Sequence, residues 1–110
     1  MPRDKTEMND VYTVRVAGAS HRQDALSEVT SGSTCLVELD KHNPHDENAV
    51  KLSVNGVHIG FVPRDAAAPL AQLMRAGATV TGVVESVGRS RPNTPLGAIV
   101  ELTVDYAGVR

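Results

Sequence analysis

This chain of 110 residues has few aromatic residues, a single cysteine and no large excess of either charge. Only 3% of the residues are aromatic and tryptophan is absent, so the core must be built from aliphatic side chains. The single cysteine, Cys35, lies in an apolar run and is expected to be a small buried side chain in a reducing compartment. These shortages exclude a disulfide scaffold and predict one ordinary small domain.

Long apolar runs are also missing. None approaches the roughly 20 residues of a membrane span, and the first ten residues lack the apolar segment of a signal peptide. We therefore expect a cytoplasmic protein with no membrane partner. Eleven Lys and Arg residues against thirteen Asp and Glu residues give a formal net charge of −2. This balance excludes proteins that coat nucleic acid through a broad basic face, so any nucleic-acid contact must be small and local.

Alternating apolar residues predict a mainly β domain over residues 11–110, after a frayed tail at 1–10. The expected strands span 11–17, 34–40, 50–54, 57–61, 78–87 and 98–106, with two short helices at about 20–31 and 63–77. Most strands follow one another without a crossover helix. The sheet should therefore be largely antiparallel and should close into a small barrel of about six strands.

The clearest local signal is a hairpin around the two-residue turn Asn55-Gly56. A two-residue loop pairs the apolar residues of both strands on the core face, namely Val50 with Phe61, Leu52 with Ile59 and Val54 with Val57. Gly60 then lies opposite Lys51 on the outer face. There, a missing side chain permits close approach by a ligand or by another strand.

Two further local signals concern the helices. Ser20 and Gln23 have the spacing of a capping box for the first helix. Pro69 is expected in the first turn of the second helix or at a kink, because proline cannot donate a backbone hydrogen bond deeper in a helix.

Catalytic and phosphate-binding motifs are absent. The chain contains no G-x-S-x-G, G-x-x-x-x-G-K-[ST], G-x-G-x-x-G or H-E-x-x-H pattern. His42 and His45 have an H-x-x-H spacing beside Asp46, and a metal-dependent nuclease or hydrolase built on these three residues is one alternative. The same stretch also fits an Asx turn headed by Asn43. We expect no enzyme, no cofactor and no metal.

Several motifs together resemble the HIRAN domain over residues 11 to about 87. They are Gly18 followed by Arg22-Gln23, the stretch Asn43-Pro44-His45-Asp46-Glu47-Asn48-Ala49-Val50, the turn Asn55-Gly56, Ile59-Gly60-Phe61-Val62-Pro63, and residues 70–77. The resemblance implies a small OB-like barrel with two helices, in agreement with the predicted order of elements. The chain is most similar to the short stand-alone bacterial members, since no helicase motif accompanies it.

In the family's DNA-binding members the domain holds the 3′ end of single-stranded DNA. The resemblance implies the same partner here, in DNA repair or replication-fork processing and alongside a DNA-processing protein. Asp46 corresponds to the residue that contacts the terminal 3′-hydroxyl, and His45 to an aromatic residue that stacks on the terminal nucleotide. A carboxylate accepts from a hydroxyl but repels a 3′-phosphate, so it can select a free end. The residues expected to contact DNA are His21, Arg22, Asn43, His45, Asp46, Lys51, Phe61 and Arg64.

A function of a different class stays open at this point. The outer strands, or the basic loop at 88–97, can dock a partner protein on the same barrel with no affinity for DNA. The near-neutral charge and the few aromatic residues favour this alternative. A DNA-binding domain should lose affinity with salt and with Asp46→Ala, whereas a protein-docking domain has no such affinity to lose.

Overall fold

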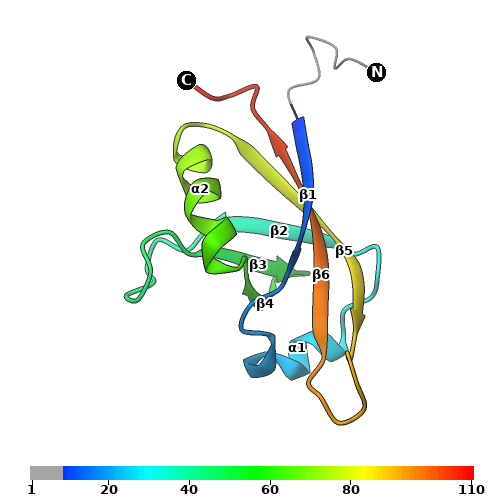
Figure 1. Cartoon of the computed structure of the whole chain (residues 1–110). Coiled ribbons are helices and arrows are strands. Elements are labelled where there is room, and N and C mark those ends of the chain that lie inside the picture. The colour runs from blue at the N-terminus through cyan, green and yellow to red at the C-terminus, as the bar shows by residue number, and fades with distance from the viewer. Residues whose placement is uncertain (1–8) are drawn as a thin grey trace.

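The computed structural model describes residues 9–110 as six strands and two helices (Figure 1). The strands are β1 (Asn9–Arg15), β2 (Thr34–Leu39), β3 (Val50–Val54), β4 (Val57–Phe61), β5 (Thr79–Gly88) and β6 (Gly97–Asp105). The helices are α1 (Gln23–Ser27), preceded by the 3₁₀ turn η1 (Ala19–His21), and α2 (Arg64–Arg75). The predicted class, mainly β with two short helices, is confirmed.

All strand pairs are antiparallel, in the order β1-β6-β5-β2-β3-β4. The sheet is strongly curved (Figure 1), but its two edge strands meet only at an isolated bridge between Ala17 and Phe61. Each residue of that bridge donates its amide to the other's carbonyl, at 2.8 and 2.9 Å. The chain turns away at Gly18, with φ 75°, into η1. The sheet is therefore not the fully closed barrel that the sequence predicts.

The core lies inside the curved sheet and beneath both helices. Cys35 is 1% exposed, and burial raises the pKa of its thiol to about 11, so it packs as a small apolar side chain, as predicted. The helix α2 contributes Ala67, Leu70 and Ala71 to this core. The largest fully buried aliphatic side chains are Leu26, Val50, Leu52, Ile59, Leu70, Val84, Val100, Leu102 and Val104.

The register of the β3–β4 hairpin follows the prediction only at its tip. Val54 pairs with Val57, but an irregularity between Leu52 and Ser53 makes Leu52 pair with Gly60 and Lys51 with Phe61. Such a bulge adds one residue to one strand and increases the local twist. The expected core position of Val57 is wrong, because the tip of the hairpin faces α1 and solvent, leaving this side chain 51% exposed.

The helix termini also differ from the prediction. Arg22 is the N-cap residue of α1 and no side chain caps it, so the capping box of Ser20 and Gln23 is wrong. The Gln23 amide instead donates to the carbonyls of Ala19 and Leu96 and accepts from the Leu96 amide at 2.8 Å. These bonds satisfy both ends of the amide and tie η1 to the β5–β6 loop.

Because α2 begins at Arg64, Pro69 lies inside the helix, beyond its first turn.

The described residues also bear on the ends of the chain and on membranes. β1 begins at Asn9, so residues 9 and 10 of the expected tail belong to the sheet, and its residues 1–8 lie outside the part described. Within residues 9–110, no helix is long and apolar enough to cross a membrane.

Gly60 lies where the two edges of the sheet meet. Its φ of 146° is a conformation that L side chains rarely adopt, and an added Cβ would lie 2.5 Å from the Ala17 carbonyl oxygen and against the Val16 side chain. The predicted close approach at Gly60 is therefore confirmed, and the approaching segment is the chain that follows β1. The predicted position of Gly60 opposite Lys51 is wrong, because the bulge makes it pair with Leu52.

Gly60→Ala should destabilise the domain by about 2–4 kcal/mol, because the strained φ and the clash with Ala17 both resist relief. The matched control is Gly88→Ala, since a Cβ at Gly88 meets nothing within 4 Å and should change stability by less than about 0.5 kcal/mol. Urea unfolding of both variants measures the difference. Equal unfolding midpoints for the two variants would contradict the tight contact between Gly60 and Ala17.

Candidate nucleic-acid interface

Most of the predicted site residues meet at one pocket beside the Ala17–Phe61 bridge, which we call the seam pocket. Its volume is about 260 Å³, and it lies between the 41–48 loop and the start of α2. Five of the eight predicted residues line it, together with Ala17, Ala49 and Val62; the five are Asn43, His45, Asp46, Phe61 and Arg64. The structure thus brings together residues that the sequence separates by 21 positions, Asn43 to Arg64.

Local hydrogen bonds shape the 41–48 loop. The Asn43 side-chain oxygen accepts from the amides of His45 and Asp46 at 2.9 and 3.1 Å, which is the Asx turn that the sequence predicts. Asp46 in turn accepts from the Asn48 amide through Oδ1 at 2.9 Å. Arg75 of α2 donates to the Asn48 side chain at 2.8 Å and so fastens the loop to the helix. The position of Asp46 is therefore set by the backbone around it.

The second carboxylate oxygen of Asp46 faces a cation. Oδ2 lies 3.5 Å from Nε of Arg64, whose side chain is 79% exposed, whereas the Asp46 side chain is 20% exposed. A pair this open to solvent contributes only about 0–1 kcal/mol to stability. Its chemical value is that a recessed hydrogen-bond acceptor stands beside an accessible guanidinium.

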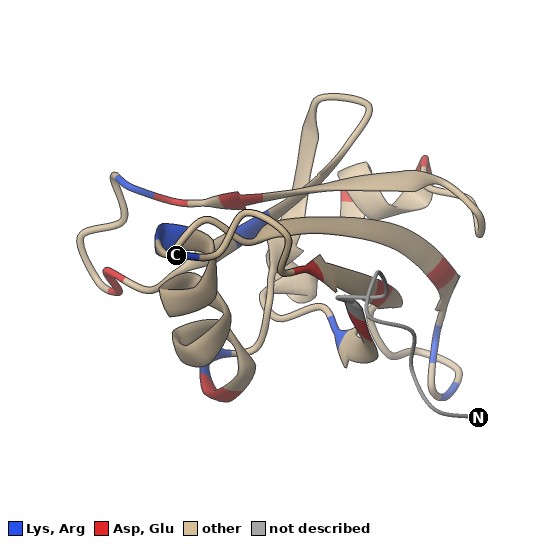
Figure 2. Cartoon of the chain, turned by 90° about the horizontal axis from the view of Figure 1, so that it is seen from above, with Lys and Arg blue, Asp and Glu red and all other residues tan. Residues whose placement is uncertain are grey.

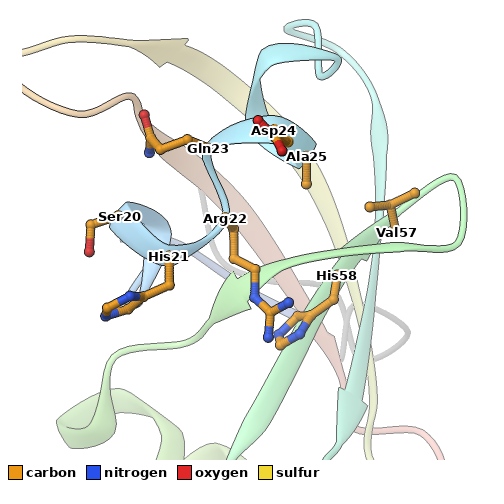
Figure 3. A pocket seen from close by; sticks show the side chains of 8 residues that line it. All are labelled: Ser20, His21, Arg22, Gln23, Asp24, Ala25, Val57 and His58. Atoms are coloured by element: carbon orange, nitrogen blue, oxygen red, sulfur yellow. The ribbon is translucent and has the colours of Figure 1, made fainter.

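His21 and Arg22 line a second cavity, which we call the β4 pocket. It has a volume of about 500 Å³ and lies between the η1–α1 segment, Ser20 to Ala25, and the β4 residues Val57 and His58 (Figure 3). The Arg22 guanidinium lies beside the His58 imidazole, while His21 points away from both. This pocket offers hydrogen-bond donors and positive charge from Arg22.

His58 is a site residue that the sequence analysis missed. Its Nε2 lies 2.9 Å from the Gly60 carbonyl oxygen, and its ring meets Phe61 edge to face, with centroids 4.8 Å apart. Phe61 also lines the seam pocket, so these two rings connect the two pockets along β4. The alternation along β4 placed the rings on opposite faces, and only the bulge in the hairpin brings them together.

Burial lowers the pKa of His58 below its ordinary value of 6.5, and the nearby charges of Arg22 and Lys51 lower it further. The Gly60 carbonyl and Asp40 act in the opposite direction. The imidazole is therefore mainly neutral at pH 7. Lys51, the remaining predicted residue, lines neither pocket and influences the site through its charge on His58.

In the view of Figure 2, acidic and basic residues are interspersed over several elements. No group of three or more His, Cys, Asp or Glu side chains within residues 9–110 is placed to hold a metal ion. His42 does not join His45 and Asp46 in lining the seam pocket.

The depressed pKa of His58 gives a pH dependence of stability. The unfolded chain takes up the proton more readily than the folded one, so the contribution of His58 is complete above pH 6.5 and is lost as the pH falls through the folded pKa. Between pH 7 and pH 5 the urea midpoint of the wild type should fall further than that of His58→Gln. His42→Gln, which changes an exposed histidine of the loop, should follow the wild type. Parallel curves for all three proteins would contradict this assignment.

Comparison with known proteins bears on the fold and the family of this chain. Two solved structures share the fold: the HIRAN domain of human HLTF, with a TM-score of 0.68 and 24% identity over 86% of this chain and 74% of that one, and a protein from Lactobacillus plantarum, with a TM-score of 0.64 and 22% identity over 86% and 97%. Comparison with curated proteins gave no significant match. The sequence model of the HIRAN domain matches residues 10–105, and the chain therefore belongs to the HIRAN domain family.

Proposed function

We propose that this domain binds the 3′-hydroxyl end of single-stranded DNA, without catalysing a reaction, in DNA repair or replication-fork processing. The observation that supports the proposal is the pairing of Asp46 with Arg64 in the seam pocket. A hydroxyl needs an acceptor and the preceding phosphate needs a cation, and these two groups stand side by side.

The terminal hydroxyl donates to Oδ2 of Asp46, since Oδ1 already accepts from the Asn48 amide. A hydrogen bond to a charged group is worth about 1.5–3 kcal/mol, which is a factor of roughly 10–100 in affinity. A 3′-phosphate would place its negative charge against the same carboxylate and be repelled. Arg64 is exposed enough to reach the phosphate on the 5′ side of the terminal nucleotide.

The rings beside the pocket supply contacts to bases. His45 is exposed at the seam pocket and Phe61 is half-buried in its wall. Stacking of a base on an aromatic ring is worth about 1–3 kcal/mol, and a histidine ring can take this role. From Phe61 the bound DNA strand continues past His58 to Arg22 in the β4 pocket. This path needs few phosphate contacts, as the net charge of −2 requires.

Asp46→Asn tests the carboxylate while keeping an oxygen for the Asn48 amide. The variant should bind a short single strand with a free 3′-hydroxyl about 10–100 times more weakly than the wild type and should lose its preference over the 3′-phosphate strand. Fluorescence anisotropy at low salt measures both strands.

The matched control for this test is Asp105→Asn. Asp105 accepts from the Ala107 amide two residues along the chain at 2.9 Å, as Asp46 does from Asn48, but it lines neither pocket. This control should bind both strands like the wild type. Equal affinity of the folded wild type for the two strands would refute selection of the hydroxyl, and no affinity for either would refute DNA binding.

His45→Ala should weaken binding of the same strand by about 5–100-fold, because it removes one stacking platform at the seam pocket. His42→Ala, in the same loop but outside the pocket, is the control and should leave the affinity unchanged. His45→Tyr should bind more tightly than the wild type, since a larger ring stacks over more of the base. Equal losses for His42→Ala and His45→Ala would mean that only the charge or order of the loop matters.

A further inference from the structure

A groove without an assigned role lies between α1 and the tip of the β3–β4 hairpin. Its volume is about 390 Å³, and we call it the acidic groove. Asp24, Ala25, Glu28 and Val29 line it from the helical side, and Val54, Asn55 and Val57 line it from the hairpin. The groove thus combines apolar side chains with two carboxylates.

One of the apolar side chains that line the groove is exposed to solvent. Val57 is 51% exposed, although the alternation along β4 predicts that it faces the core. Val54, its partner across the hairpin, also lines the groove but is only 4% exposed. An apolar concavity with a few polar groups at its margin is the usual form of a binding site, and an aliphatic side chain placed there would cover Val57.

The two carboxylates determine which charge a ligand bound in the acidic groove should carry. Asp24 and Glu28 are four residues apart and so lie on the same side of the helical turn. Both are exposed, and within residues 9–110 neither forms an ion pair. They repel one another and would repel a phosphate, so the acidic groove does not extend the DNA path. A positively charged group relieves this repulsion.

We propose that the acidic groove docks a short segment of a partner protein in which an aliphatic side chain is flanked by Lys or Arg. The aliphatic side chain covers Val57, and the flanking cations face Asp24 and Glu28. This inference goes beyond DNA binding and does not depend on it. The acidic groove shares Asp24, Ala25 and Val57 with the β4 pocket, so the docked segment lies next to the proposed DNA path.

The probe is a capped heptapeptide with Lys-Leu-Lys at its centre and Gly and Ser elsewhere. Amide chemical shifts of the full chain are followed by NMR during titration. Saturable changes are expected in the segments 24–29 and 54–57. The same peptide with Glu in place of both Lys residues should produce none, and the peptide with Ala in place of Leu should bind at least fivefold more weakly.

Variants of the protein separate the apolar and charged parts of the groove. Val57→Ser, and separately the pair Asp24→Asn with Glu28→Gln, should each weaken the Lys-Leu-Lys peptide at least fivefold. The controls are Val11→Ser, which changes a valine 58% exposed on β1, and the pair Glu38→Gln with Glu101→Gln, which removes two exposed carboxylates elsewhere. Both controls should bind like the wild type, and dispersed amide spectra establish that each variant is folded.

The proposal is overturned if the Glu peptide binds as well as the Lys peptide, if the groove residues show no saturable shift, or if the controls weaken binding as much as the groove variants do. Shifts of the same residues on simple concentration of the protein would assign the groove to a second copy instead. Shifts there on addition of the DNA strand alone would assign it to DNA. Asp46→Asn should bind the peptide normally, so failure of DNA binding and failure of this inference are distinguishable.

Discussion

Two backbone hydrogen bonds between Ala17 and Phe61 hold the candidate site together. They join the chain after β1 to the edge strand β4, and the approach is close enough that only glycine is accommodated at position 60. The pair gives the seam pocket one wall from Ala17 and another from Phe61. The site thus lies where the curled sheet almost closes, and its geometry depends on the contact that holds the two edges together.

β4 contributes residues to both the seam pocket and the β4 pocket. Phe61 faces the loop that holds Asp46, and its edge contact with His58 leads to Arg22 at the β4 pocket. A narrow path of this kind supplies an acceptor, a few rings and two guanidinium groups without a basic face. Under the proposed function, these groups would recognise the end of a DNA strand rather than its length, because an end offers a hydroxyl that internal nucleotides lack.

The short helix α1 lies between two neighbouring pockets. Arg22, its N-cap residue, lines the β4 pocket, Glu28 lines the acidic groove, and Asp24 lines both. In the two proposals, Arg22 attracts phosphate at the β4 pocket, whereas Asp24 and Glu28 attract cationic side chains at the acidic groove. If both proposals hold, a DNA end and a partner protein would bind at adjacent places beside β4.

The sequence by itself determined the strands, the Asn55-Gly56 turn and the Asx turn at Asn43, because alternation and turn chemistry act between residues close in the chain. With the family motif it also indicated Asp46 and Arg64. Only the tertiary structure decided the bulge opposite Leu52, the exposure of Val57 and the bonds from Gln23 to Leu96. The Gln23–Leu96 bonds join positions 73 residues apart, and the hairpin tip packs against α1, so neither follows from alternation or turn chemistry within one segment.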